Sequence, residues 1–252
     1  MVADKTMISF VVPAHNEESE LPSTLQAIQL AASGAGQPYE IIVVDDASAD
    51  ATAQIASRAG AKVIQINRRQ IAAARNTGGR AARGEYVFFV DADTRIRARH
   101  VTQAIDALNA GYVGGSARVA FDGSVPVWGR VLLFGFGALY FGLNLGAGAF
   151  LFTTRRNFDS VAGFDEQYFA GEEVYFSLAL KTLGRFKVLR EAIVTSGRKL
   201  RMYPAKQFLR KFFGVIIAGP RGVRSRANLS LWYDGKREKH LLASGANVDG
   251  PE

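Results

Sequence analysis

Two aspartates, Asp91 and Asp93, come directly after the apolar run at residues 86–90. Such a run of aromatic and β-branched residues is typical of a strand buried in a parallel sheet, whose carboxyl end opens onto the ligand crevice. Carboxylates at that point can hold a divalent cation such as Mg²⁺, which proteins often share with substrate phosphates. The pattern predicts a metal-assisted enzyme acting on a phosphorylated ligand; an ordinary Asp-rich turn is the alternative.

Two earlier strand ends also carry polar side chains. His15 and Glu17 follow the first apolar run, and Asp45 and Asp46 end the second. Each loop alone is weak support for a site, because helix caps explain much of it; Ser48 or Asp50 can cap the next helix. Since the carboxyl ends of parallel strands meet at one edge of a sheet, we expect all three loops to line the same crevice.

The elements that position these loops alternate between strand and helix patterns. Strands are predicted at 7–12, ended by Pro13, and at 39–44, 62–66 and 86–90. Helices are predicted at 17–32, up to residue 59, and at 71–82, the last ended by Gly84. This order predicts an α/β fold with a Rossmann-like, mostly parallel central sheet and helices on both faces.

The second half has a looser pattern that predicts a mixed region. Helices are expected at 101–108, 172–183 and 203–217, and strands at 112–121, 147–153, 186–189 and 193–195. Residues 131–154 carry no charge but include five glycines, so we interpret them as a helix to about residue 145 and then a buried strand. A helix in the core or on a membrane surface is favoured there over a spanning one.

Composition narrows the function classes. The chain has 252 residues, no Cys and three His, which excludes a disulfide scaffold, a Cys-based zinc site and a thiol nucleophile. The net charge of +8 suits phosphorylated substrates or an anionic membrane, and no nucleic-acid recognition motif accompanies it. The N-terminus lacks the pattern of a signal peptide, so we expect a cytoplasmic location.

Neither a dinucleotide fingerprint nor a Walker loop is present, so nucleotide phosphates would have to be met by metal and basic side chains. Six short segments, in order and spacing, resemble family 2 glycosyltransferases of the GT-A fold. The resemblance covers roughly residues 7–200. The segments are residues 12–17 (VPAHNE), 44–48 (VDDAS), 74–78 (ARNTG), 91–93 (DAD), 163–166 (GFDE) and 171–173 (GEE).

The resemblance implies a nucleotide-sugar donor, most often a UDP-sugar, and an inverting transfer. It implies that Asp46 lies toward the base and that Asp91 and Asp93 face the ribose and a Mg²⁺ or Mn²⁺ ion. Arg75 would support the diphosphate, with a salt bridge to a strand-end aspartate as the alternative. The full implied donor-binding set is Pro13, Ala14, His15, Glu17, Asp45, Asp46, Arg75, Asp91, Ala92, Asp93 and Arg198.

The resemblance also implies a general base at the start of the helix predicted from residue 172. Glu173 is the first choice by position, and Glu172 is the second. The alternative is that paired glutamates in a first helical turn only stabilise the helix.

The chain departs from the family where many members have a metal-binding His after the last core strand. Here Arg198 and Lys199 stand near that position, either to share the charge of the diphosphate or as a solvated basic surface. The Gln-x-x-Arg-Trp signature of processive synthases is missing, which favours transfer of a single sugar.

Residues 1–221 are expected to form one GT-A domain, with a donor-binding half at about 7–95 and an acceptor-binding, catalytic half at about 96–221. Residues 222–252 are expected to be a basic, flexible tail. The apolar segment 131–145 and residues 208–217 could form a basic, apolar face for a membrane surface and a lipid-linked or cell-envelope acceptor. A sugar nucleotidyltransferase and a non-catalytic, membrane-associated binding protein are the alternatives.

Overall fold

The computed structural model describes residues 6–123 and 142–198 continuously, together with twelve single or paired residues: 126, 128, 129, 135, 137, 201, 205, 206, 209, 210, 223 and 224. The helices predicted at 131–145 and 203–217 therefore lie largely outside the described residues, as does most of the predicted tail. Among the described residues, no helix combines the length and apolar character needed to cross a bilayer.

The fold is built on one sheet of eight strands in the order β3-β2-β1-β4-β7-β6-β8-β5. The first half supplies four mutually parallel strands: β1 (Ile8–Ala14), β2 (Tyr39–Asp46), β3 (Lys62–Ile66) and β4 (Tyr86–Val90). The predicted Rossmann-like half of the sheet is confirmed.

The second half extends the same sheet in mixed directions. β7 (Phe150–Thr154) pairs antiparallel with β4 and with β6 (Gly114–Phe121), and β6 runs parallel to β8 (Phe186–Thr195). The short strand β5 (Thr94–Arg95), which follows the two aspartates, pairs antiparallel with the end of β8. This last pairing brings the end of β8 beside the aspartates.

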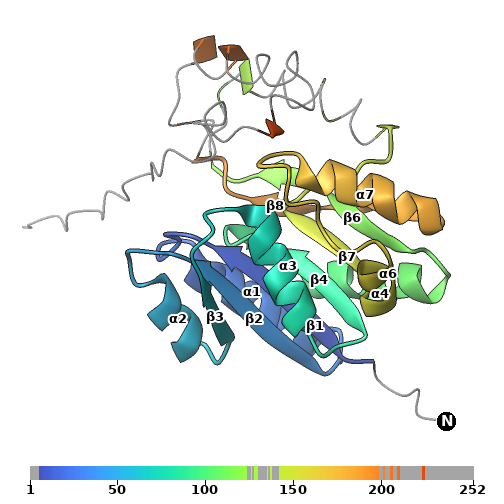
Figure 1. Ribbon diagram of the computed structural model, residues 1–252, viewed down its shortest axis with the longest axis horizontal. Helices are drawn as coiled ribbons and strands as arrows, with labels where there is room; N and C mark the ends of the chain where they lie inside the picture. The colour runs from blue at the N-terminus through green and yellow to red at the C-terminus, as the bar shows by residue number, and fades with distance from the viewer. Residues whose placement is uncertain are drawn as a thin grey trace, which may run out of the picture.

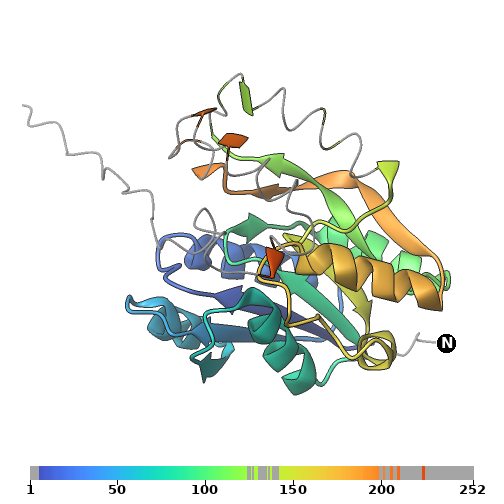
Figure 2. The ribbon, with the colours of Figure 1, turned by 45° about the horizontal axis from the view of Figure 1, so that its top comes forward.

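Helices cover both faces of the sheet, as predicted (Figures 1 and 2). One face is packed by α1 (Leu21–Gly34), α2 (Thr52–Arg58) and α4 (Ala98–Asn109). The other is packed by α3 (Ile71–Ala81), α6 (Arg155–Ser160) and α7 (Glu172–Leu183). The sheet thus separates two hydrophobic cores.

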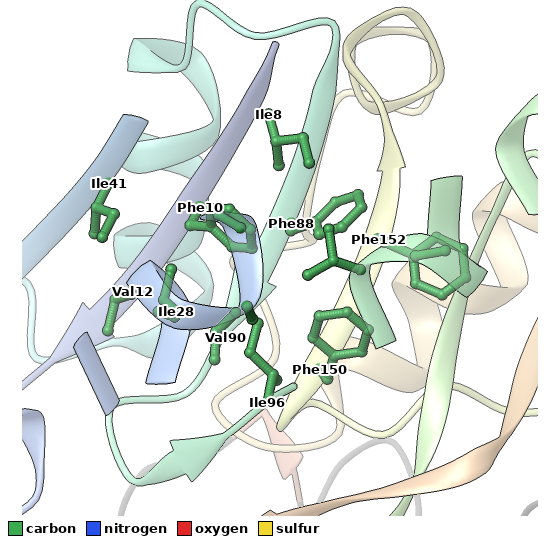
Figure 3. Packing of buried hydrophobic residues seen from close by; sticks show 14 of the residues in the cluster. Ile8, Phe10, Val12, Ile28, Ile41, Phe88, Val90, Ile96, Phe150 and Phe152 are labelled. Carbon is green, nitrogen blue, oxygen red and sulfur yellow. The ribbon is translucent and has the colours of Figure 1, made fainter. Parts of the chain in front are cut away.

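Strand β4 contributes to both cores because its side chains alternate between the two faces. Phe88 meets Phe10 and Phe150 edge-on, with ring centroids 5.5 and 5.8 Å apart (Figure 3). On the other face Phe89 lies edge-on to Phe164, at 5.0 Å. All five residues of β4 are buried, as the apolar run predicted.

Several predicted boundaries were wrong for local reasons. β1 continues through Pro13 because its pairing with β4 ends at Val11, and a missing N–H is tolerated at such an edge. Gly84 does not end α3, which stops at Ala81; a Cβ on Gly84 would lie 2.6 Å from the Met7 carbonyl oxygen, so glycine is needed there for close strand contact.

Two further elements differ from the prediction. The strands expected at 186–189 and 193–195 are one strand, β8, because a bulge opposite Ala117 and Arg118 absorbs the polar residues between them. α2 begins after Ala51, and neither candidate side chain caps it at that position; Asp50 instead accepts a hydrogen bond from the N–H of Thr52.

Helix α3 lies close to the sheet because Gly78 faces it. A Cβ at Gly78 would lie 2.3 Å from Cγ1 of Val11 and 3.1 Å from Cγ2 of Val44. Both valines are fully buried, so neither can move aside without disturbing the core.

We predict that Gly78→Ala destabilises the protein by about 1–3 kcal/mol through overpacking, despite the better helix propensity of alanine. Urea denaturation measures the change. Arg80→Ala, at an exposed position of the same helix, is the matched control and should change stability little. Equal stabilities of the two variants would contradict the account of this contact.

Candidate functional site

The aspartate turn is held between the centre of the sheet and its far edge. Asp91 follows β4 and donates its N–H to the carbonyl of Ala149, while Thr94 begins β5 beside Thr195 of β8. From α1, Thr24 donates its hydroxyl to the carbonyl of Ala92 at 2.8 Å. The turn is therefore fixed from three directions.

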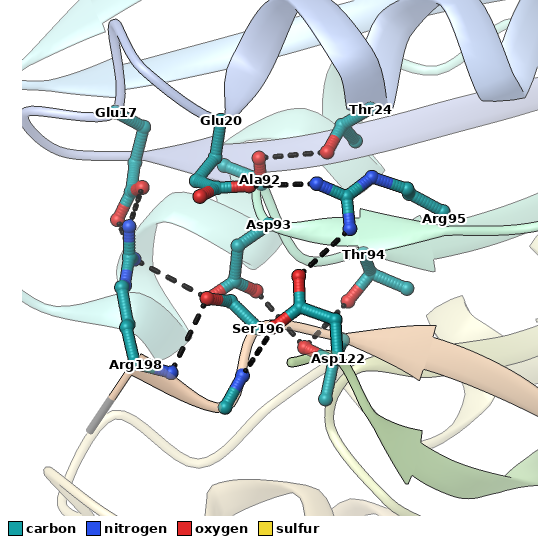
Figure 4. A network of polar contacts seen from close by, with 12 residues as sticks. Glu17, Glu20, Thr24, Ala92, Asp93, Thr94, Arg95, Asp122, Ser196 and Arg198 are labelled. Carbon is teal, nitrogen blue, oxygen red and sulfur yellow. Dashed lines mark hydrogen bonds and ion pairs between the residues drawn. The ribbon is translucent and has the colours of Figure 1, made fainter. Parts of the chain in front are cut away.

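Asp93 lies next to a buried cation. The guanidinium of Arg198 binds Glu17 through two parallel hydrogen bonds of 2.8 and 2.6 Å, and its Nη2 lies 3.3 Å from Oδ2 of Asp93 (Figure 4). The other oxygen of Asp93 accepts the hydroxyl of Thr195 at 3.1 Å. Burial would lower the pKa of Arg198, but Glu17 and then Asp93 outweigh it and raise that pKa, so the cation stays charged.

A second arginine braces the same network from its other side. Arg95 contacts Glu20 at 3.1 Å and Asp122 at 2.9 Å, and the N–H of Gly197 donates to Asp122. Burial would raise the pKa of Asp122, but the bond from Gly197 and the charge of Arg95 lower it overall. These contacts join α1, β5, β6 and the end of β8.

Arg75 joins the aspartate turn to helix α7. Its guanidinium contacts Glu172 at 2.6 Å and Asp91 at 2.8 Å, and donates to the carbonyl of Gly148 at 3.0 Å. Its side chain is 1% exposed. Within the described residues its Nε–H has no acceptor. The salt bridge considered as the alternative role for Arg75 is the arrangement present, and the buried guanidinium is occupied by protein.

The two glutamates at the start of α7 have different environments. Glu172 is buried against Arg75; burial raises its pKa and Arg75 partly offsets this. Glu173 is partly buried, and burial together with the charge of Glu172 raises its pKa to about 8. Glu172 is therefore engaged by direct contact with Arg75 at 2.6 Å, while Glu173, with a pKa of about 8, is poised to exchange a proton.

The loops after β1 and β2 are tied to each other. His15 Nδ1 lies 2.8 Å from the carbonyl of Asp46, and the N–H of Asn16 donates to Ser48. Asn16 and Ala47 both have positive φ, of 53° and 58°. Left-handed backbone costs Ala about 1–2 kcal/mol, so these turns are held against strain.

Asp46 is buried and accepts three backbone hydrogen bonds, each 2.7 Å long, from Arg68, Arg69 and Gln70. Both of its oxygens are thus used to shape the loop before α3. Asp45 similarly accepts from the N–H of Ser48. The geometry gives both aspartates a structural role at this edge of the sheet.

Asn76 fastens the later GFDE segment (residues 163–166) to α3. Its side-chain amide both donates to and accepts from the backbone of Phe164, at 2.8 Å each, and also donates to Glu166. Beyond this segment Tyr168 stacks on Tyr175, with centroids 3.7 Å apart.

Two residues of the predicted tail contact this region. The N–H of Phe169 donates to the carbonyl of Val223, and Arg224 lies 5.0 Å from the ring of Tyr168 and donates to its hydroxyl. The described part of the predicted tail therefore packs on the loop that precedes α7.

The chemistry of Asp91 and Asp93 fits a divalent ion that is shared with a phosphorylated ligand. Both offer carboxylate oxygens, and their side chains are 28% and 20% exposed. No group of three or more His, Cys, Asp or Glu residues that could enclose a metal occurs in the part of the chain that the structure describes. Ligand phosphates and water would have to supply the remaining positions, as is common for Mg²⁺.

The structure brings most predicted residues to one edge of the sheet, around the carboxyl ends of β1, β2 and β4. The sequence interpretation missed Glu20, Thr24, Asp122 and Thr195, which hold the aspartate turn, and Gly148, whose carbonyl holds Arg75. No residue-type signal distinguishes them, because each contact joins segments that are distant in the sequence.

We predict that Glu173→Gln removes a pH-dependent loss of stability. A carboxyl whose pKa is raised on folding favours the folded state fully below its ordinary pKa of 4.5, and that contribution is lost as the pH rises toward about 8. The melting temperature of the variant relative to wild type should rise across this window and then level off. A gain of about 1 kcal/mol would appear as about 2–4 °C; a difference independent of pH would contradict the raised pKa.

A family model matches residues 9–165, more than half of the chain, and describes glycosyl transferase family 2. Among curated proteins, an undecaprenyl-phosphate 4-deoxy-4-formamido-L-arabinose transferase of Pseudomonas paraeruginosa is 33% identical over 121 residues, covering 44% of this chain and 35% of the relative. Succinoglycan biosynthesis protein ExoO of Rhizobium meliloti is 29% identical over 204 residues, covering 76% and 57%. The match thus spans about a third of the former and just over half of the latter.

Solved structures show the same fold at low identity. Mannosyltransferase PcManGT of Pyrobaculum calidifontis, in complex with GDP-Man and Mn²⁺, superposes with a TM-score of 0.64 at 18% identity, covering 94% of this chain and 67% of that one. S. aureus TarS 1–349 in complex with UDP-GlcNAc gives 0.61 at 19%, covering 92% and 74%. These neighbours are GT-A glycosyltransferases, and the chain has their fold. Its sequence match and its architecture agree: the chain belongs to glycosyl transferase family 2.

Proposed function

We propose that this chain transfers one sugar from a nucleoside-diphosphate sugar to a hydroxyl acceptor, with inversion at the anomeric carbon. The observation that carries the proposal is the position of Arg75, which contacts both Glu172 and Asp91 and so places Glu173 near the aspartate turn. One carboxylate is neutralised by Arg75, and the next keeps a pKa of about 8 at the start of α7. Arg75 in turn contacts Asp91, so the candidate base and the candidate diphosphate site are linked through one side chain.

In this mechanism deprotonated Glu173 accepts the proton of the acceptor hydroxyl as its oxygen attacks the anomeric carbon. The bond from that carbon to the diphosphate breaks on the opposite face, which inverts the configuration. Glu172 is the second candidate for this role, because its carboxylate is already held by Arg75 at 2.6 Å.

The donor lies, in this proposal, along the carboxyl ends of β1, β2 and β4. The loop of Pro13, Ala14, His15 and Glu17 and the pair Asp45 and Asp46 form the nucleoside side. Asp91, Ala92, Asp93 and Arg198 form the ribose and diphosphate side. Mg²⁺ or Mn²⁺ on Asp93 and Asp91 would offset the charge of the leaving diphosphate.

A UDP-sugar is the proposed donor, with a GDP-sugar as the second choice. Solved neighbours are complexed with UDP-GlcNAc and with GDP-Man and Mn²⁺, which supports a nucleotide-sugar and a divalent ion without selecting the base. The names of the curated relatives support a lipid-linked or polysaccharide acceptor, and the net charge of +8 supports contact with the inner face of a membrane.

We predict that nucleotide sugars raise the melting temperature in the presence of Mn²⁺. A ligand at about 100 times its Kd adds about 2.7 kcal/mol to the free energy of unfolding. A panel of UDP- and GDP-sugars, with Mn²⁺ or EDTA, identifies the donor by thermal shift, and Asp93→Asn should lose the Mn²⁺-dependent part. Absence of any shift across the panel would contradict donor binding.

We predict that Glu173→Gln lowers kcat by about 10²–10⁴-fold, the usual contribution of a general base, while nucleotide binding is retained. Wild-type kcat should rise with pH toward about 8, because the base must lose its proton. Release of the nucleoside diphosphate measures the rate; release of pyrophosphate instead would indicate a nucleotidyltransferase. Glu172→Gln is the matched comparison and should cost more stability and less kcat. The reverse ranking would make Glu172 the base.

A further inference from the structure

The guanidinium of Arg198, which lies beside Asp93, is buried inside the protein rather than exposed on its surface. The side chains of Arg198 and Glu17 are 8% and 10% exposed, so solvent screens their ion pair little. Glu17 is anchored in turn, because its N–H donates to the hydroxyl of Thr52 at 2.8 Å. The positive charge 3.3 Å from Asp93 is therefore held in place before any ligand arrives.

This fixed charge acts on two kinds of ligand in opposite directions. A divalent ion approaching Asp93 is repelled by the guanidinium and must compete with it for the same carboxylate. A diphosphate is attracted by its charge; because Nη1 and Nη2 already donate to Glu17, this attraction is electrostatic and does not use the paired hydrogen bonds of a free guanidinium. Arg198 should thus weaken metal binding in the absence of nucleotide and strengthen nucleotide binding in the absence of metal.

We propose that Arg198 is a permanent cation of the donor site. It offsets part of the diphosphate charge that a divalent ion would otherwise offset. It makes Mn²⁺ affinity low until the nucleotide is bound, and it leaves nucleotide binding only partly dependent on metal. The inference concerns the same site as the proposed function and rests on it for the identity of the anionic ligand.

The first test measures Mn²⁺ alone, by electron paramagnetic resonance of the nucleotide-free protein. Arg198→Met should bind Mn²⁺ at least about tenfold more tightly than wild type, because a competing cation has been removed. Adding Asp93→Asn should reverse the gain. Arg95→Met is the matched control: Arg95 belongs to the same network but contacts Glu20 and Asp122, so its loss should leave Mn²⁺ affinity close to wild type.

The second test measures UDP and GDP binding by calorimetry, with Mn²⁺ or with EDTA. Wild type should retain binding of one nucleotide in EDTA, and Arg198→Met should lose it while still binding in Mn²⁺. If Arg198→Met fails to fold because Glu17 is left buried and unpaired, Glu17→Gln with Arg198→Met removes both charges and serves in this arm.

Two results would overturn the inference: Mn²⁺ affinity unchanged by Arg198→Met, or wild-type nucleotide binding abolished by EDTA. Failure of the proposed function has a different signature. If neither UDP nor GDP binds wild type in either buffer, the donor assignment falls and the nucleotide half of the inference falls with it. The Mn²⁺ measurement still decides whether Arg198 controls the metal affinity of Asp93.

Discussion

The buried ion pairs of Arg75 are the interaction on which the site depends. One fully buried guanidinium contacts Asp91, at the end of a sheet strand, and Glu172, which lies 97 residues after Arg75 at the start of helix α7. Removing one partner of such a buried pair typically costs about 3–5 kcal/mol, because an uncompensated charge remains. The arrangement therefore fixes the spacing between the aspartate turn and the start of α7, and it engages Glu172 directly while Glu173 keeps a raised pKa.

Helix α3 can present Arg75 in this way because of two neighbours in its sequence. Asn76 fastens the backbone of Phe164, and Gly78 lets the helix lie against β1 and β2. The resemblance had drawn attention to the segment at residues 74–78 as a binding motif. In the structure Arg75, Asn76 and Gly78 mainly hold other parts of the site in place. The segment therefore has a structural role.

The alternation of strand and helix in the first half was predictable, because buried strands and amphipathic helices leave strong local patterns. The second half was less predictable. Strand β5 has only two residues, and a bulge interrupts the regular pattern of β8. In the same way the placement of Asp91 and Asp93 followed from the end of an apolar run. The contacts of Arg198, Asp122 and Thr195 with that turn depend on a pairing between distant segments, which no local pattern encodes.

Strand β4 fills both hydrophobic cores, with Phe88 on one face and Phe89 on the other. Neither face can therefore lose its packing while the other keeps its own, and the two cores form a single cooperative unit. The aspartate turn is the direct continuation of this strand, and the N–H of Asp91 donates to the carbonyl of Ala149, so we expect this amide to exchange slowly. Hydrogen exchange at Asp91 should then report the stability of the two cores together, because the strand that ends at this residue belongs to both.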